Sequence, residues 1–525
     1  MSKEKCALAL AVLAVFTSAV FAQATTAILK GQIVDTDGAG LPGVPVTVMS
    51  KTHGDAKKTV MTDIDGNYKF QLLPPANDYM IAVAYPSFAP LELGPIDLDP
   101  GKTTVQNVTL RSSEELTTNV EVVAHGNIVD TESTKTASSF NTEFIEGLPI
   151  IGHNFQDILT LTPGVTDTDG DGNPNVQGAR ATGLQIRLDG GNITDPVSGT
   201  FGQNLNLDAV EEIEVITSGA SAEFGRADGG FANIITKSGG NDFEGSFKLF
   251  WQGRFLNGNG ATGNNDTQFT RNQPQGDLRR LSPFITGGGA LKKDKVWYFA
   301  TIEYIHQANA VSLGGSSFET SNEGHNAFGK ITWQVNSDNK LALQYNDDPR
   351  TFRGGFLGFG VDADSDATFV QGARTPQLRW TSIISPTLLL ETLLTHFDSG
   401  ISIVPVSNLF STADVSTIVN RQGNSVSLQA LYPVKQCSDR SGSFIQNCDP
   451  SQGKLSMFQI DLLNGTTTGP FPVRTDDSRK RDSIKADLSY TVEDAWGEHQ
   501  IKSGMEFAEE SFSDSPITNP VLSLP

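Results

Sequence analysis

The chain has 525 residues and a net charge of −22. This surplus of carboxylates argues against nucleic acid as a partner, because the phosphates would be repelled. Only 38% of the residues are hydrophobic, and no uncharged apolar run reaches the ~18 residues that a membrane-spanning helix needs. The 52 glycines favour a turn-rich, mainly β protein.

Residues 1–24 have the pattern of a secretory signal peptide. Lys3 and Lys5 precede an apolar core, Ala7 to Val20, and a small-residue cleavage site follows at Ala22 to Ala24. A short membrane anchor is the alternative, although the apolar core is short for a span. Export would place the rest of the chain in an oxidising compartment.

Residues 27–110 alternate short β-prone segments with Asp-Gly and Pro-Gly turns, which predicts a first β unit. Five short stretches are characteristic: Gly31 to Asp35, Leu41 to Val44, Thr62-Asp63, Gly66 to Tyr68 and Leu73 to Pro75. In these stretches the unit resembles the carboxypeptidase regulatory-like domain, a transthyretin-type β-sandwich. The resemblance implies an accessory domain and not a peptidase.

The residues of this unit agree with an accessory role. A zinc peptidase needs two or three protein ligands and a general-base carboxylate. The stretch has one histidine, His53, which lies in a turn-like run and is expected to be a surface residue. Sandwiches of this kind also bind carbohydrate on exposed aromatic side chains, and core packing would explain the same residues. The candidates are Tyr68, Tyr79, Tyr85 and Phe88.

Residues 111–133 form a polar linker with one β-prone segment. Within this segment, Val120, Glu121, Val122 and Val123 could add as a strand to the sheet of a partner. An ordinary linker strand is the alternative.

Residues 134–239 have the pattern of a compact, glycine-punctuated α/β domain. Ser139 to Gly164 combines short helical segments with a Leu-Pro turn and a Thr-Pro-Gly stop. Leu184 to Gly190, Val210 to Thr217 and Ala222 to Gly240 follow. The residues that stand out are Asp189, Gly190, Glu223, Arg226, Gly229, Gly230 and Asn233. Together they resemble the plug domain of TonB-dependent outer-membrane receptors, of the Oar-like type that carries a sandwich at its front.

This resemblance implies a set of partners. The segment Val120 to Val123, placed just before the plug, would be the TonB box that binds a TonB-type energy-transducing protein. The barrel would lie in outer-membrane lipid. The substrate would be large, and metal chelates, oligosaccharides and peptides or proteins all remain open.

One acidic loop of the plug is a candidate metal-binding site. Asp167, Asp169 and Asp171, followed by Gly172, match the start of a calcium loop. The twelfth position is Gly178 and not glutamate, so the bidentate closing ligand is missing. A solvated loop explains the same residues, and no other cofactor is expected.

From residue 240 to 525 the pattern is strict alternation. Phe243 to Trp251 places apolar residues or glycine at every second position, with Glu244, Ser246 and Lys248 between them. Apolar-out, polar-in alternation is typical of a transmembrane β-barrel, and about nine strands of this kind are expected. Six aromatic side chains are candidates for lipid-facing girdles, unless they pack between strands: Trp251, Trp297, Tyr298, Trp333, Tyr345 and Trp380.

Two long polar inserts, residues 257–280 and 399–481, are expected to be extracellular loops. The second contains Cys437 and Cys448, a close pair that would form a disulfide in an oxidising compartment. A metal site at this pair is less favoured, because no histidine or third cysteine accompanies it.

A plugged transporter has about 22 strands. The stretch after Lys237 is too short for that many strands and their loops. An open wall would leave unsatisfied strand edges in lipid. The sequence is therefore expected to be a truncated receptor, and a smaller closed barrel is the alternative. A rival hypothesis is a surface-exposed carbohydrate-binding or adhesive β protein. An enzyme is not expected, since no catalytic constellation is present.

Overall fold

The computed structural model describes the greater part of the chain after residue 26. The described ranges are 27–53, 57–100, 102–112, 135–148, 154–168, 172–220, 224–253, 279–313, 316–355, 366–385, 387–406, 473–492 and 499–518, with short strands between residues 417 and 468 and at 521–524. The mainly β architecture expected from the sequence is confirmed. Among the described residues, no helix is long and apolar enough to cross a membrane.

The N-terminal unit is a sandwich of two four-stranded sheets. One sheet has the order β4-β1-β7, with β8 also paired to β1, and the other has the order β3-β2-β5-β6. Its strands are β1 (Ala27–Val34), β2 (Pro45–Met49), β3 (Lys58–Met61), β4 (Asn67–Leu73), β5 (Ala76–Val83), β6 (Leu91–Leu98), β7 (Thr103–Val105) and β8 (Val108–Thr109). Alternate residues of the strands meet in one apolar core.

Two of the aromatic side chains considered for sugar binding belong to this core. Tyr68 and Tyr79 are buried, and each donates its hydroxyl to a backbone carbonyl, at Gln106 and Pro74 respectively. Tyr85 and Phe88 are half-buried against the same core. An exposed platform is therefore excluded for Tyr68 and Tyr79.

The second unit is an α/β domain around a five-stranded sheet with the order β13-β12-β15-β14-β9. Strand β15 lies at the centre, parallel to β12 and antiparallel to β14. Its elements are β9 (Thr136–Asn141), α2 (Thr142–Gly147), α3 (Phe155–Leu159), β10 (Val165–Thr166), β11 (Asn175–Val176), η2 (Ala181–Gly183), β12 (Leu184–Leu188), β13 (Gly191–Asn192), η3 (Leu207–Ala209), β14 (Val210–Ser218) and β15 (Gly230–Thr236).

The third unit is a large antiparallel sheet, called here the wall. Within the described residues, nine strands follow in the order β16-β17-β18-β19-β20-β22-β23-β30-β31, and β21 and β32 pair beside them. They are β16 (Glu244–Gln252), β17 (Arg279–Lys292), β18 (Val296–Leu313), β19 (Ser316–Asn336), β20 (Asn339–Asp347), β21 (Arg350–Arg353), β22 (Ala367–Ser385), β23 (Leu388–Pro405), β30 (Val473–Val492), β31 (His499–Asp514) and β32 (Ile517–Thr518).

Seven short strands complete the described chain: β24 (Thr417–Val419), β25 (Ser425–Ser427), β26 (Cys437–Ser438), β27 (Phe444–Ile445), β28 (Phe458–Asp461), β29 (Thr466–Thr468) and β33 (Val521–Leu524). The long insert expected at residues 399–481 is shorter than predicted. Strand β23 continues to Pro405 and pairs with β30 as far as Thr475. Arg474 to Asp482 of β30 are all polar, so apolar alternation does not reveal this part of the strand, although its backbone pairs with β23.

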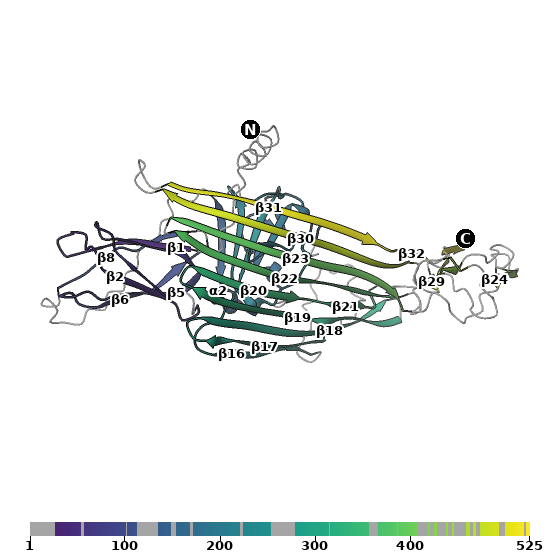
Figure 1. Ribbon diagram of the computed structural model, residues 1–525. Coiled ribbons are helices and arrows are strands. Elements are labelled where there is room, and N and C mark those ends of the chain that lie inside the picture. Colours follow the sequence, from purple (N-terminus) through teal and green to yellow (C-terminus); the bar gives the residue numbers. More distant parts are fainter. Residues whose placement is uncertain are drawn as a thin grey trace, which may run out of the picture.

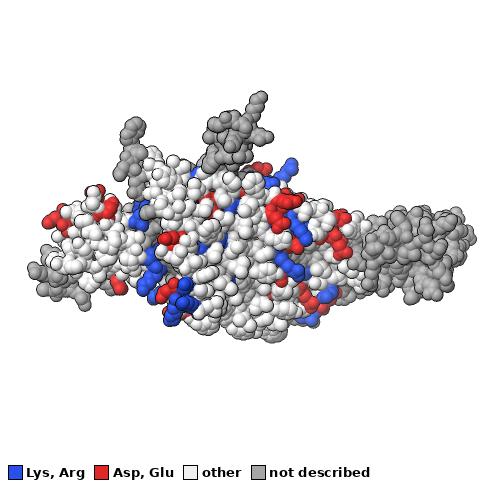
Figure 2. Space-filling view, in the orientation of Figure 1, with Lys and Arg blue, Asp and Glu red and all other residues white. Residues whose placement is uncertain are grey.

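The wall strands turn apolar side chains outward and polar side chains inward, as the alternation predicts. Ile484, Leu488 and Tyr490 of β30 are exposed, whereas Lys485 and Asp487 between them are buried. Figure 2 shows the outer face of the wall as a mostly uncharged band, with charged side chains gathered toward its two ends. A surface of this kind suits contact with lipid.

The prediction of an outward-facing girdle is wrong for one of the six aromatic residues. Trp297 is 1% exposed and faces inward, where its Nε1 donates to Asn241 Oδ1 at 2.8 Å. Trp251, Trp333, Tyr345 and Trp380 are exposed on the outer face, as expected. Trp297 adjoins the plug-to-wall junction, where an indole with a hydrogen-bond partner packs better inward.

The sandwich lies beyond one end of the wall, and the plug sheet lies against the inner face of the wall (Figure 1). Four wall residues, Phe299, Phe328, Ala373 and Phe397, belong to the apolar core of the plug. The sandwich lies at the end of the wall where β17–β18 and β19–β20 are joined by tight turns. Short turns mark the periplasmic side of outer-membrane barrels.

Candidate functional site: the contact between plug and wall

The plug hairpin β12–β13 carries two of the residues singled out from the sequence. Asp189 and Gly190 form its two-residue turn, with φ of 43° and 83°. An Asp-Gly turn fits because both positions of such a hairpin require positive φ. The Asp189 carboxylate accepts from Thr236 N at 3.1 Å and from Thr236 Oγ1 at 2.5 Å, which ties the turn to the end of β15.

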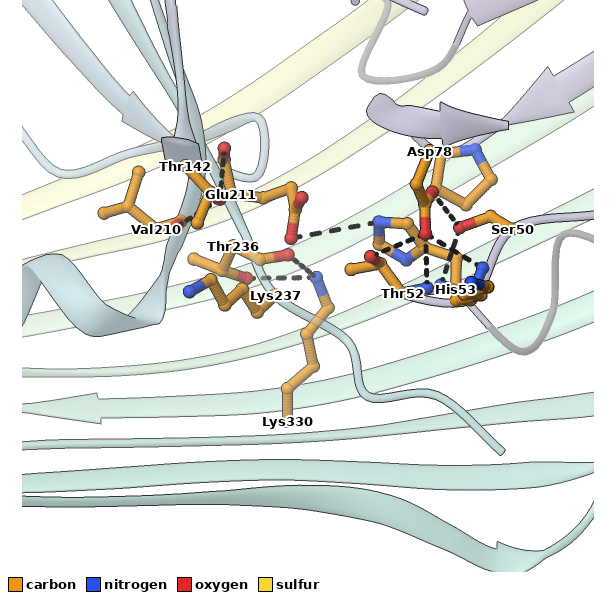
Figure 3. A network of polar contacts seen from close by, with 12 residues as sticks. Ser50, Thr52, His53, Asp78, Thr142, Val210, Glu211, Thr236, Lys237 and Lys330 are labelled. Atoms are coloured by element: carbon orange, nitrogen blue, oxygen red, sulfur yellow. Dashed lines mark hydrogen bonds and ion pairs between the residues drawn. The ribbon is translucent and has the colours of Figure 1, made fainter. Parts of the chain in front are cut away.

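A lysine of the wall completes this cluster. The buried Lys330 of β19 extends its Nζ to Thr236 O at 3.1 Å, Thr236 Oγ1 at 3.0 Å and Asp189 Oδ2 at 3.4 Å (Figure 3). From β22, Arg379 donates to the Asp189 carbonyl oxygen and also pairs with Glu391. Two cations of the wall therefore hold one turn of the plug.

Strand β30 provides a second pair of cations to the same hairpin region. Arg479 Nη1 lies 2.9 Å from Asp195 Oδ2. Arg481 donates to the carbonyl oxygens of Thr194, at 2.7 Å, and Asn192, at 3.3 Å. The two arginines are two residues apart and therefore face the same side of the strand.

The environment of Asp195 gives it a defined pH dependence. Burial by itself would raise the pKa of Asp195, but the hydrogen bonds from Ser198 N and Arg479 outweigh it and the pKa is lowered. The ion pair therefore contributes its full stabilisation above the usual aspartate pKa of about 3.9, and the contribution is lost as the pH falls through the lower folded-state pKa.

This dependence can be measured. Between about pH 5 and pH 3, we expect the wild-type chain to lose more thermal stability than Asp195→Asn, because only the wild type must protonate a stabilised carboxylate. Thermal unfolding of both purified proteins, measured across this pH range, gives the slope of Tm against pH for each. Equal slopes would show that the Arg479 pair does not stabilise the plug.

Hydrogen bonds fill much of the remaining interface. Gln203 Nε2 donates to the carbonyl oxygens of Asn346, at 3.1 Å, and Ala373, at 2.9 Å. Asn204 N donates to Asp348 Oδ2 at 2.7 Å, and Asn206 Nδ2 to Thr301 Oγ1 at 3.1 Å. Apart from the four apolar side chains named above, the described contact is built from charges and hydrogen bonds.

The other singled-out residues serve different parts of the plug. A Cβ at Gly229 would lie 2.9 Å from Ala179 Cβ, and one at Gly230 would lie 2.7 Å from Ile216 O, so both positions require glycine for close packing. Asn233 is buried opposite Arg187 and Glu214 in the neighbouring strands.

Arg226 is largely exposed, has a φ of 63°, and pairs with Glu510 of β31 at 3.1 Å. Glu223 lies outside the described residues. The structure thus brings Asp189, Gly190 and Arg226 to the wall, and keeps Gly229 and Gly230 inside the plug.

The remaining predicted sites lie largely beyond the described residues. Asp167 Oδ2 accepts from Gly172 N at 3.0 Å, whereas Asp169 and Asp171 are not described. The segment Val120 to Val123, Cys448 and residues 1–26 are also outside them, and Cys437 opens β26. The calcium loop, the TonB box, the disulfide and the signal peptide therefore stay predictions.

The cations of the wall are functional residues that the sequence did not identify as such. Alternation along a wall strand predicts which side chains face inward, but it does not predict their partners. A polar or basic residue at an inward position of a wall strand is the available signal, and Lys330, Arg379, Arg479 and Arg481 all follow it.

Known proteins match the first two units and part of the third. Residues 28–111 match the carboxypeptidase regulatory-like domain, and residues 129–231 match the TonB-dependent receptor plug domain. The TonB-dependent transporter Oar of Myxococcus xanthus is 27% identical over 387 residues, which cover 67% of this chain and 36% of the relative. The chain thus spans about a third of that relative's length.

Solved structures that match part of the chain include a siderophore receptor and an outer-membrane transporter. The siderophore receptor PirA of Acinetobacter baumannii is 16% identical with a TM-score of 0.46, over 72% of this chain and 48% of that chain. The outer-membrane transporter YddB of Escherichia coli is 13% identical with a TM-score of 0.45, over 73% and 54%.

A plug set against the inner face of a β wall defines the class of outer-membrane β-barrel receptors. The regulatory-like domain, the plug domain and the similarity to Oar together support a TonB-dependent receptor of the Oar type. It belongs to the outer membrane, and its relatives are receptors and transporters rather than enzymes.

Proposed function

We propose that the protein binds a large substrate at its extracellular side and imports it with energy from an inner-membrane TonB complex. The observation that carries this proposal is the polar contact between plug and wall. Buried ion pairs gain little net stability over well-packed apolar contacts, because each charge must be desolvated. A plug held by Lys330, Arg379, Arg479 and Arg481 fits its site specifically, yet a modest force can displace it.

The energy source would act through the segment before the plug. Val120 to Val123 would add as a strand to a TonB-type protein, using backbone hydrogen bonds. A pull on this segment would reach β9, the edge strand of the plug sheet, which is paired only with β14 among the described strands. The substrate class stays open among metal chelates, oligosaccharides and peptides or proteins.

A proline in this segment tests the coupling. Val122→Pro removes a backbone N–H and fixes φ, and we expect it to weaken binding of a purified TonB-type periplasmic domain at least about tenfold. Val122→Thr keeps the N–H and the β-branched shape and is the matched control. Binding can be measured by surface plasmon resonance. Equal binding by both variants would place the TonB contact elsewhere.

A further inference from the structure

The sandwich presents one well-ordered loop to the plug. Residues 50–52 are held by the carboxylate of Asp78, which accepts from Ser50 Oγ at 2.5 Å and from Lys51 N, Thr52 N and Thr52 Oγ1 at 2.9 Å each. Burial by itself would raise the pKa of Asp78, but these bonds outweigh it and the pKa is lowered. A charged, fully bonded aspartate therefore fixes the loop in place.

This loop buries the histidine expected at the surface. His53 is 2% exposed, because it enters the contact between sandwich, plug and wall. Among the described residues, neither of its ring nitrogens has a hydrogen-bond partner, and Nε2 lies 4.0 Å from Glu211 Oε2 of β14 (Figure 3). Buried polar groups are nearly always satisfied, so an imidazole placed between two units without a hydrogen bond calls for an explanation.

The contact closes a space between plug and wall. A cavity of about 70 Å³ is bounded by His53, Pro74 and Pro75 of the sandwich and by Thr236 of the plug. Its wall side carries the charged residues Lys330, Lys340, Arg379 and Glu391. The fit is close, because a Cβ at Gly240 would lie 2.6 Å from Lys51 O. The sandwich thus covers a small, partly charged cavity between plug and wall.

A second contact between sandwich and plug works against docking. Burial raises the pKa of Glu212 on β14, and the charges of Asp99, Glu214 and Asp97 raise it further. The pKa of Asp97 is raised as well, by burial and by Asp99. Asp99 pairs with Lys102 at 2.6 Å and Glu214 pairs with Lys135, so the acidic excess of this contact falls on Asp97 and Glu212.

We propose that the sandwich is a releasable cap, which docks through the His53 loop over the periplasmic opening between plug and wall and must leave before anything passes. The buried contact between His53 and Glu211 holds the cap, and the acidic groups around Glu212 weaken the docking. The step from cap to transport rests on the proposed function, whereas docking and release do not.

Docking can be measured by distances between spin labels in the full chain. One label replaces Ile64, which is 86% exposed on the sandwich, and the other replaces Lys293 in the β17–β18 turn, with the native cysteines changed to serine. We expect one narrow distance distribution in the wild type. His53→Ala and Glu211→Gln should each lower the ratio of docked to undocked molecules about tenfold, and the double variant should do no more than either alone.

Two controls separate release from misfolding. Met61→Ala, at an exposed site on β3, should leave the distribution unchanged. A label pair within the sandwich, at Ile64 and Val105, should keep its distance in every variant. If His53→Ala changes the distance between these two labels, the sandwich itself is disturbed. Docking is then judged from Glu211→Gln, which leaves the sandwich sequence intact. A broad wild-type distribution, or an unchanged one in Glu211→Gln, overturns the cap.

The acidic contact adds a pH dependence with a defined sign. The docked state raises the pKa of Glu212 through Asp97 and Asp99, so it binds protons more tightly than the undocked state. Docking should therefore weaken as the pH rises from the ordinary pKa of a glutamate to the raised pKa of Glu212 in the docked state. Burial raises the pKa of Glu211, whereas the charge of His53 lowers it; the other charged groups near it are Lys237, Asp78 and Lys330.

Glu212→Gln should reduce this pH dependence, measured with the same labels between about pH 5 and pH 8. A docked fraction that rises with pH, or the same pH dependence in the variant, would contradict the proposal. Because the labels report docking without substrate or a TonB-type protein, a failure of the proposed transport would leave this result interpretable.

Discussion

Lys330→Met is expected to loosen the plug more than any other single change at the wall. The methionine fills a similar volume, but it leaves the buried carboxylate of Asp189 without its cation and Thr236 O without its donor. Removing one partner of a buried pair costs about 3–5 kcal/mol, because the other charge stays desolvated. Native-state hydrogen exchange at the amides of β12 and β15 should therefore accelerate more than about a hundredfold.

An exposed ion pair of the same wall is the matched control. Lys480 and Asp398 lie 3.7 Å apart, and both side chains are more than a third exposed. Lys480→Met should cost less than about 1 kcal/mol, because water screens such pairs. If exchange at β12 responds equally to both substitutions, the Lys330 cluster does not hold the plug.

Phe155→Ala is expected to destabilise the plug by about 3–5 kcal/mol. The ring is fully buried in the first turn of α3, in edge contact with Phe201 at a centroid distance of 6.3 Å. Its core also includes Phe397 of the wall, so the cavity left by the ring would weaken both the plug and its contact with β23. Pulse proteolysis of the purified chain in urea, with plug cleavage followed on gels, measures the loss.

Phe144→Ala provides the comparison within the same domain. Phe144 lies on α2 and is 45% exposed, so its removal leaves no closed cavity. The urea midpoint of this variant should stay close to that of the wild type. Similar midpoints for Phe155→Ala and Phe144→Ala would show that the α3 contact does not stabilise the plug.

The wall illustrates what alternation alone can predict. Alternation predicts that Leu249 and Trp251 lie on the face opposite Lys248, because side chains two apart always share a face of a strand. Leu249 and Trp251 are exposed, and Lys248 turns to Asp208 of the plug, as predicted. The Asp189-Gly190 turn was likewise visible, since few residue pairs tolerate two positive φ angles. These features depend only on neighbours along the chain.

Partners could not be predicted in the same way. Lys330 and Asp189 are 141 residues apart, and Arg479 and Asp195 are 284 residues apart. The local sequence around an inward-facing lysine is the same whether its ammonium group contacts an aspartate, a carbonyl oxygen or water. His53 and Trp297 were placed on the wrong side of the surface because their burial comes from another unit, namely the plug for His53 and the plug-to-wall junction for Trp297.

The sequence by itself therefore determined the order of the units, the mainly β class, the direction of the wall side chains and the glycine turns, because backbone geometry and local periodicity decide these. Only the tertiary structure decided which cations hold the plug and which face of the sandwich docks. Ion pairs and buried polar groups depend on distance and desolvation between distant segments, and those quantities exist only once the chain is folded.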